Sequence, residues 1–483
     1  MKQRIENIFQ LKYFQYLVLI VVIYFVAFFK LGNFPFRLWD ESMFAVNAYE
    51  MAENGNYMVP YFDGQVDWRN SKPLLLTWIQ VGLIKTVGFS ELTMRLPSAL
   101  AVTGSILLLF TFLKRQINNL FAWIASLILL TSQGYITYHT GRTADADALM
   151  SFFVLATVIF WAKWMLEFKA KHIFFSLLFF SLAIVTKSFA ALIFALPILM
   201  FTVLQLKGDV AKYLFKSKGF YAGIMLVLVT FFVIFFLREM YQPGYLDYTF
   251  SNDAGRLGKV IETHAHGWDF YLEHIFYDRF VFWTIPFLLA IPIWFNMEKT
   301  TVKTLLSFAF ILIASYLLVI TFSVTKLLWY DMPIYPFMAC AAAVPVYFFL
   351  QNTSAGKSIF YSLAIIGLLF FIPYRKMFFA SQGNTFSSGD RKEELAGIFL
   401  RDQLRNKQAC DMTVYHHGYK GAVLCYQYRY ADLGKKLEIK YTADFLPGEK
   451  VFVSHDSLKQ VLIANYVVDT LEVYETGIFV RIR

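Results

Sequence analysis

Charged residues are scarce in this chain of 483 residues: Lys, Arg, Asp and Glu make up 16% of it, against about a quarter in soluble domains. Apolar residues supply 58% and aromatic residues 19%, including 53 Phe. This composition excludes an ordinary soluble globular protein, because so much apolar surface needs a bilayer to cover it. The chain is therefore predicted to be a polytopic α-helical membrane protein.

Cysteine is also rare, and three cysteines are too few for a disulfide framework. Cys340 lies in an apolar segment, whereas Cys410 and Cys425 lie in a polar tail and either form one pair or stay as thiols. Internal repeats are lacking too, and a transporter would usually show them.

A basic soluble domain is missing, although the formal net charge is +10. The cations lie mainly in short connections between apolar segments, where an excess of Lys and Arg marks the cytoplasmic side. The expected partners are therefore the bilayer and anionic lipid ligands, and no nucleic acid.

Long apolar runs are what the chain does contain. The first run spans about 13–29. The residues that follow it are bulky and charged, which favours a retained helix over a cleaved signal peptide. With the later runs we expect about 11–13 transmembrane helices. Basic connections alternate with the others, which predicts an inside N-terminus. The connections predicted to face outward are 32–92, 139–145, 238–278, 323–328 and everything after about 374.

Two domains are predicted, a transmembrane domain over 1–374 and a small soluble α/β domain over 375–483. In the second, "MTVYHHG", "AVLCYQYRYA", "EKVFVSH" and "IFVRIR" are typical of strands, and "SLKQVLIAN" is typical of a helix. Within the outer connection 32–92, "ESMFAVNAYEMAENG" and "PLLLTWIQVGLIKTVG" predict two amphipathic helices on the membrane surface.

Asp40 and Glu41 follow directly on the first apolar run. A carboxylate at the membrane edge is costly to desolvate unless it faces a polar cavity or a partner, which makes the pair a candidate functional site. The alternative is a solvated charge at the interface.

The stretch "HTGRTADADALMSFF" places Arg142, Asp145 and Asp147 at the start of another apolar run. Acids at i and i+2 point to different sides of a helix, so only one of them is expected to face the same cavity as Asp40. The alternative is that acids suit the start of a helix, with Thr143 as its cap.

Candidate cations come from two outward connections and from one further outward edge between two apolar runs. Arg69 and Lys72 lie in "DWRNSKPLLLTW", Lys187 in "LAIVTKSFAALIF", and Lys326 with Tyr330 in "FSVTKLLWYDMP". Such groups suit a phosphate at headgroup depth, and Lys326 and Tyr330 at i and i+4 could share one oxyanion. Snorkelling lysines and an aromatic belt are the alternatives.

A possible divalent metal site, for Zn or Mg, lies in "ETHAHGWDFYLEH". His264 and His266 stand near Glu262, and a His-x-His pair beside a Glu can hold such an ion. Histidines that face solvent are the alternative.

Taken in order, "LWDESMFAVNAYEMAENG", "ELTMRLPSAL", "GRTADADALMSFF", "LAIVTKSFAALIF" and "SVTKLLWYDMPIYPFMA" resemble a known family over about residues 15–345. The chain resembles the bacterial relatives of protein O-mannosyltransferases, and more closely the ArnT-like lipid A glycosyltransferases (glycosyltransferase family 39/83-like), whose membrane fold is called GT-C. Ser71 stands where relatives often carry Glu, and Met43 where many carry Arg.

The resemblance implies a role for each motif residue. Asp40 is the expected catalytic carboxylate with Glu41 beside it, and Asp147 stands in the place of the family's second Asp, with Asp145 as its rival. Lys72 and Tyr330 match positions that hold the lipid phosphate of the donor. Lys187, Lys326 and Arg69 are expected to assist them, and His264 matches a His that can bind metal.

The expected activity is inverting transfer of a sugar from a polyprenyl-phosphate donor to an acceptor outside the bacterial inner membrane. A phosphate is a good leaving group that cations can stabilise, and Asp40 would deprotonate an acceptor hydroxyl. Lipid A or another envelope glycolipid is the favoured acceptor. Protein O-glycosylation, transport and a membrane scaffold are the alternatives.

Overall fold

The computed structural model describes residues 12–137, 139–206, 209–255, 258, 264–352, 359–382 and 388–483. The chain forms two compact units. Unit 1 contains Met1–Phe29, Ser71–Leu76 and Pro97–Gln382, and unit 2 contains Lys30–Asn70, Thr77–Leu96 and Gly383–Arg483. The domain boundary expected at 374–375 stays a prediction. Unit 2 also takes in most of the connection 32–92.

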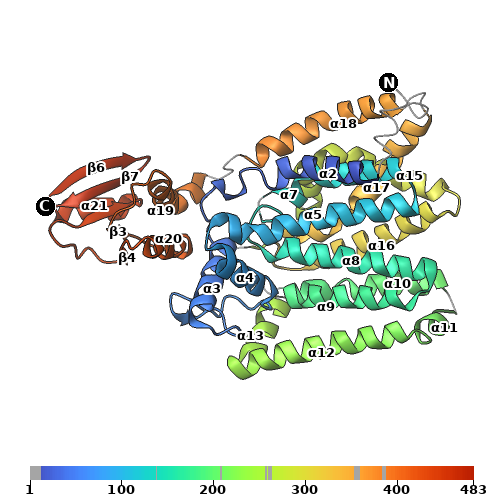
Figure 1. The fold of residues 1–483 in the computed structure, drawn as a ribbon, viewed down its shortest axis with the longest axis horizontal. Coiled ribbons are helices and arrows are strands. Elements are labelled where there is room, and N and C mark those ends of the chain that lie inside the picture. Colours follow the sequence, from blue (N-terminus) through green and yellow to red (C-terminus); the bar gives the residue numbers. More distant parts are fainter. Residues whose placement is uncertain are drawn as a thin grey trace. The chain divides into compact units, whose positions relative to one another are not determined.

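Unit 1 is helical, and Figure 1 shows α8, α9 and α12 side by side. Its α-helices are α2 (Lys12–Ala27), α5 (Glu91–Gln116, in this unit from Pro97), α6 (Asn119–Leu130), α7 (Gln133–Ile136), α8 (Ala146–Glu167), α9 (Ala170–Leu192), α10 (Ala195–Leu206), α11 (Val210–Leu214), α12 (Lys218–Tyr241), α13 (Tyr245–Thr249), α14 (Phe270–His274), α15 (Thr284–Asn296), α16 (Thr301–Phe322), α17 (Tyr335–Asn352) and α18 (Ile359–Ala380). Its π-helical turns are η3 (Phe250–Ala254) and η5 (Ile275–Arg279), and its 3-10 turns are η6 (Val281–Trp283) and η7 (Leu328–Ile334).

Among the described residues, seven helices are long and apolar enough to cross a membrane, or eight if one bent pair counts as a span. This is fewer than the 11–13 expected, because several apolar runs are interrupted in the structure. The apolar stretch from Asn119 to Ile136 breaks between α6 and α7, and the pair Phe270–Arg279 and Val281–Asn296 bends by 88°. The chain is a multi-pass membrane protein with broken as well as continuous apolar helices.

Unit 2 combines both predicted amphipathic helices with the C-terminal α/β domain. Its elements are η1 (Leu31–Asn33), α3 (Asp40–Asn54), β1 (Tyr61–Phe62), β2 (Gln65–Val66), α4 (Leu75–Val87, in this unit from Thr77), α19 (Ser388–Arg405), β3 (Met412–Tyr415), α20 (Gly421–Asp432), β4 (Leu437–Lys440), β5 (Lys450–Val453), α21 (Asp456–Asn465), β6 (Val468–Tyr474) and β7 (Gly477–Ile482). Helix α3 ends at Asn54 and is capped by Gly55, whose φ of 72° suits a residue without a Cβ.

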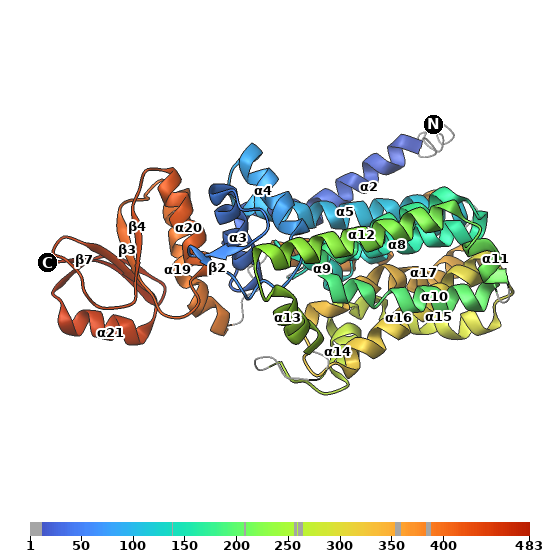
Figure 2. The ribbon, with the colours of Figure 1, turned by 90° about the horizontal axis from the view of Figure 1, so that it is seen from below.

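The C-terminal domain is a five-stranded sheet in the order β4-β3-β5-β7-β6. Strand β3 runs parallel to β4 and β5, and β7 runs antiparallel to β5 and β6. Successive residues of β5 point to opposite faces: Val451 and Val453 pack with Leu462 of α21, whereas the Phe452 ring stacks on Phe399 of α19. Helices therefore cover both faces of the sheet (Figure 2).

One predicted strand is wrong: "AVLCYQYRYA" forms helix α20. Its buried residues Ala422, Tyr426 and Tyr430 recur every fourth position and pack toward α19 and α3, so tertiary burial prevails over the strand propensity of Val and Tyr. The other three predicted strands and the helix "SLKQVLIAN" are confirmed as β3, β5, β7 and α21, while β4 and β6 were not anticipated.

Candidate functional site

The start of helix α8 carries the first two acids of the candidate site. Asp145 is the residue that caps α8, since its Oδ1 accepts the N–H of Ala146 at 2.7 Å. Thr143, the cap that the sequence suggested, leaves its buried hydroxyl without a partner among the described residues. Asp145 is therefore fixed in place by the helix that it starts.

His139 holds the other oxygen of Asp145. Its Nδ1 lies 3.1 Å from Oδ2 and must carry the proton, because a carboxylate only accepts. The ring stacks on Trp329 of η7 with centroids 3.7 Å apart, and the backbone adopts φ of 58°. A left-handed His is uncommon, so the fold imposes this orientation on the imidazole.

Asp147 makes a buried ion pair with Lys187. The Nζ of Lys187 lies 2.7 Å from both carboxylate oxygens, and the Asp147 side chain is 1% exposed. Lys187 interrupts α9 with φ −155° and ψ 74°, and its Nζ lies 5.0 Å from the centre of the Tyr330 ring. The break in α9 thus turns this ammonium toward α8 and η7.

Lys72 belongs to the short segment Ser71–Leu76 of unit 1. That segment is held by Tyr245 and Asp253, since the Tyr245 hydroxyl donates to the Ser71 carbonyl at 2.8 Å and the Ser71 hydroxyl donates to Asp253 at 3.0 Å. Lys72 itself is half-buried, and its charge acts on both Asp145 and Asp147.

Both acids lie within reach of the charges of Lys187 and Lys72, although their side chains bind different partners, His139 and Lys187. The expectation that only one of them faces the same cavity as Asp40 stays a prediction. The rule for i and i+2 assumes helical backbone at both positions, but Asp145 is extended, with φ −123° and ψ 151°. Burial raises the pKa of the Asp145 carboxyl, yet the hydrogen bond and charge of His139 outweigh it. With Lys187 and Lys72 they lower this pKa to about 2.

Lys326 is placed differently from the other predicted cations. It is 5% exposed, and its Nζ donates to the carbonyls of Ser323 at 2.7 Å and His266 at 3.1 Å. The chain is not α-helical between Lys326 and Tyr330, so their i, i+4 spacing does not bring them together as on a helix. The hydrogen bonds of Lys326 link two loops, whereas Tyr330 lies beside Lys187.

In unit 2, Glu41 is bound by Arg95. The Nε of Arg95 lies 2.7 Å from Oε1 and its Nη2 lies 2.8 Å from Oε2, and both side chains are 2% exposed. Asp40, the first residue of α3, is half-buried and follows Trp39, whose φ is 61°. The two adjacent acids therefore have different surroundings, and their predicted catalytic roles stay predictions.

Arg69 also lies in unit 2, where it contacts one acid and two aromatic rings. Its Nε lies 3.1 Å from Asp67, and its guanidinium lies over the rings of Phe62 and Tyr419. Phosphate binding by Arg69 stays a prediction.

The predicted metal ligands do not form a complete set. His266 is exposed and stacks on Phe270, and His264 is half-buried. Among the described residues, neither belongs to a group of three His, Cys, Asp or Glu side chains close enough to share an ion. Glu262 lies outside the described residues. A metal in this loop stays a prediction.

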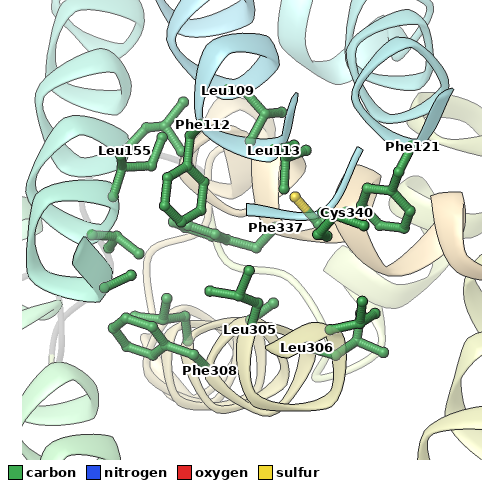
Figure 3. Close-up of a pocket in the computed structure, with 17 residues that line it drawn as sticks. Leu109, Phe112, Leu113, Phe121, Leu155, Leu305, Leu306, Phe308, Phe337 and Cys340 are labelled. Carbon is green, nitrogen blue, oxygen red and sulfur yellow. The ribbon is translucent and has the colours of Figure 1, made fainter. Parts of the chain in front are cut away.

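Three residues with clear structural roles were not anticipated: His139, Trp329 and Arg95. All three stand in stretches quoted from the sequence, and the proximity of His139 to Asp145 is the signal that could have suggested a specific partner. An apolar cavity of about 50 Å³ in unit 1 is not part of the charged group. Side chains of α5, α6, α8, α16 and α17, Cys340 among them, surround it and include no acid or base other than that thiol (Figure 3).

Comparison with known proteins identifies relatives of this chain. The family model described as dolichyl-phosphate-mannose-protein mannosyltransferase matches residues 71–236, which include Lys72, Asp145, Asp147 and Lys187. An uncharacterised protein of Aquifex aeolicus (strain VF5) is 24% identical over 332 residues, 68% of this chain and 63% of its own length. The undecaprenyl phosphate-alpha-4-amino-4-deoxy-L-arabinose arabinosyl transferase of Shewanella sediminis (strain HAW-EB3) is 28% identical over 191 residues, 38% of this chain and 34% of its own length.

Among solved structures, ArnT from Cupriavidus metallidurans bound to undecaprenyl phosphate matches with a TM-score of 0.70 and 13% identity, covering 96% of this chain and 97% of that chain. The predicted fold class is thereby confirmed: a helical GT-C membrane body with a C-terminal sheet domain. The resemblance expected from the motifs is confirmed as well.

Proposed function

Because the chain is an ArnT-like membrane protein of the GT-C fold, we propose that it is an inverting glycosyltransferase that uses a polyprenyl-phosphate sugar. The acceptor is an envelope glycolipid of the lipid A class, reached on the outer side of the bacterial inner membrane. Support for the donor comes from relatives whose names carry undecaprenyl phosphate or dolichyl phosphate. Support for the acceptor comes from the motif resemblance alone.

The observation that carries the proposal is the group of Lys72, Lys187, Asp145 and Asp147 in the matched segment, in which both acids are buried. Ionisable groups in a membrane body are rare unless they bind or react with something, and here two cations and two acids gather around one helix start. A structural ion pair would need only one acid and one cation. The second acid and the second cation go beyond such a pair, and although the four formal charges balance, the ammonium groups of Lys72 and Lys187 suit an anionic ligand such as a phosphate.

In the proposed reaction, an acceptor hydroxyl attacks the anomeric carbon of the donor. The bond between that carbon and the phosphate oxygen breaks, and polyprenyl phosphate leaves with the electron pair. The hydroxyl proton goes to Asp40, retained as the general base from the sequence resemblance. Lys187 and Lys72 stabilise the phosphate charge as it develops, and the Tyr330 hydroxyl can donate to a phosphate oxygen.

Protein O-glycosylation is the second candidate, because the matching family model is named for a protein mannosyltransferase. The two candidate activities differ only in the acceptor that receives the labelled sugar from the donor. Lipid A would carry it in one case and exported protein in the other.

The test supplies the purified full chain in proteoliposomes with a panel of labelled polyprenyl-phosphate sugars and separated lipid and protein acceptors. Transfer by the wild type that is lost in Asp40→Asn, and in Lys187→Met at a temperature at which that variant is still folded, would support the proposal. Glu53→Gln, on the same helix α3 but exposed, and Lys171→Met, exposed at the start of α9, are matched controls. No transfer from any donor would refute the activity, and equal transfer by Asp40→Asn would remove that residue from the mechanism.

A further inference from the structure

Three of the eight histidines of the chain meet in the C-terminal domain. His416 and His417 directly follow β3, and His455 lies two residues after β5. The two strands are parallel neighbours with Tyr415 opposite Val453, so their carboxyl ends bring these side chains together. The ring centroids lie 6.0 Å apart for His416 and His455, and 6.4 Å apart for His417 and His455.

The position of the cluster in the sheet is one where ligands commonly bind. From β3 the chain passes through α20 to β4 on one side, and from β5 it passes through α21 to β6 on the other side. Where the connections of two adjacent parallel strands diverge, a crevice opens beyond their carboxyl ends. The three histidines stand at this switch point.

His416 is set up to offer a lone pair. Its Nε2 lies 3.1 Å from the carbonyl of Tyr419, and since a carbonyl only accepts, Nε2 carries the proton. In a neutral ring Nδ1 is then an acceptor, yet it has no partner among the described residues although His416 is only 3% exposed. A buried acceptor without a donor is unfavourable. A histidine that donates one N–H to a carbonyl and presents the other nitrogen is the usual arrangement of a metal ligand.

We propose that His416, His417 and His455 form a binding site for a divalent transition metal of the zinc class, with the remaining position open to water or an anion. Nitrogen ligands suit zinc, and Zn–N bonds are about 2.0–2.1 Å long. No three of these nitrogens already lie within 4.8 Å of one another in the described residues. To complete the metal site, the side chains of the exposed His417 and the half-buried His455 must therefore turn toward Nδ1 of His416.

An oxyanion is the competing ligand, because α20 and α21 both begin near the cluster and helix starts attract anions. The tautomer of His416 argues against it, since a lone pair repels an anion. Lys420, the nearest cation in sequence, is already paired with Asp63. The geometry therefore favours a cation as the ligand.

The experiment uses the full chain in detergent, stripped of metal with a chelator. Titration with Co²⁺, followed by its visible ligand-field absorption and displaced by Zn²⁺, reports a site with nitrogen ligands. X-ray absorption at the zinc edge then counts imidazoles. We expect one tight equivalent, at least about 10–100-fold weaker binding in His417→Ala and His455→Ala, and loss in His416→Gln.

Because His417 is exposed, His417→Ala tests the site without disturbing the core. His266→Ala is the matched control for a histidine in the other predicted metal loop. The proposal is overturned if no metal binds, if binding survives all three substitutions, or if only His266→Ala abolishes it. Binding of inorganic phosphate that depends on His416, in place of the metal, would also overturn it.

Discussion

Two adjacent acids, Asp40 and Glu41, should respond to amide substitution in opposite ways. Glu41 accepts from Arg95 in a bidentate pair, and the remaining Arg95 donors reach three backbone carbonyls. Nη2 lies 2.6 Å from the oxygen of Pro35, and Nη1 lies 2.9 Å and 3.0 Å from the oxygens of Leu31 and Phe34. All five N–H groups of this guanidinium are thus engaged, and they join the loop before α3 to the start of α5 within unit 2.

The expected magnitudes follow from burial. Glu41→Gln leaves the buried Arg95 charge without its counter-charge, a loss of about 3–5 kcal/mol for a buried pair. Arg95→Lys keeps the charge but offers three donors in place of five, and each abandoned carbonyl costs about 1–3 kcal/mol. Asp40→Asn removes only a half-buried charge from the first turn of α3, worth about 0.3–1 kcal/mol.

The assay is thermal unfolding of the full chain in detergent, followed by tryptophan fluorescence and checked by protease resistance. At about 2–4 °C per kcal/mol for a unit of this size, Glu41→Gln should lower the unfolding midpoint by roughly 6–20 °C. Asp40→Asn and the exposed control Glu53→Gln should move it by no more than a few degrees. Glycosyl transfer should show the reverse order, with Asp40→Asn the most affected.

The reasoning is refuted if Glu41→Gln unfolds at the temperature of Glu53→Gln. The clamp by Arg95 would then contribute no stability. It is equally refuted if Glu41→Gln is stable and inactive, because Glu41 would then act in the chemistry and not in the fold.

Three further predictions follow. Asp147→Asn and Lys187→Met should each destabilise the protein by about 3–5 kcal/mol, and the double variant should recover much of this loss; additive losses would contradict a direct pair. Asp145→Asn should lose about 2.5 kcal/mol at neutral pH, because the lowered pKa of about 2 gives stability that is fully present above about pH 4 and disappears as pH falls toward 2. A difference between Asp145→Asn and wild type that grows on acidification would contradict this sign. Burial raises the pKa of the Cys425 thiol, so maleimide should label the half-buried Cys410 in the folded protein and Cys425 only after unfolding; an intact disulfide between them would contradict the free thiols of the structure.

Local patterns made part of the architecture predictable. The amphipathic periods of "ESMFAVNAYEMAENG" and "PLLLTWIQVGLIKTVG" specified α3 and α4, since helix formation depends on neighbours three and four residues away. The same reasoning failed for α20. Its three tyrosines and Val423 favour a strand locally, and only the surfaces of α19 and α3 make the helical arrangement the one that buries them.

The amino-acid sequence by itself determined the membrane class, the motif order and which residue types stand at the ends of the apolar runs. Only the tertiary structure decided how those residues pair. Lys187 meets Asp147 across 40 positions and Arg95 meets Glu41 across 54, and the break in α9 and the left-handed backbone of His139 orient the charges of unit 1. Pairing over such separations depends on packing of the whole fold, because the energy of a buried charge is set by neighbours in space and not by neighbours in sequence.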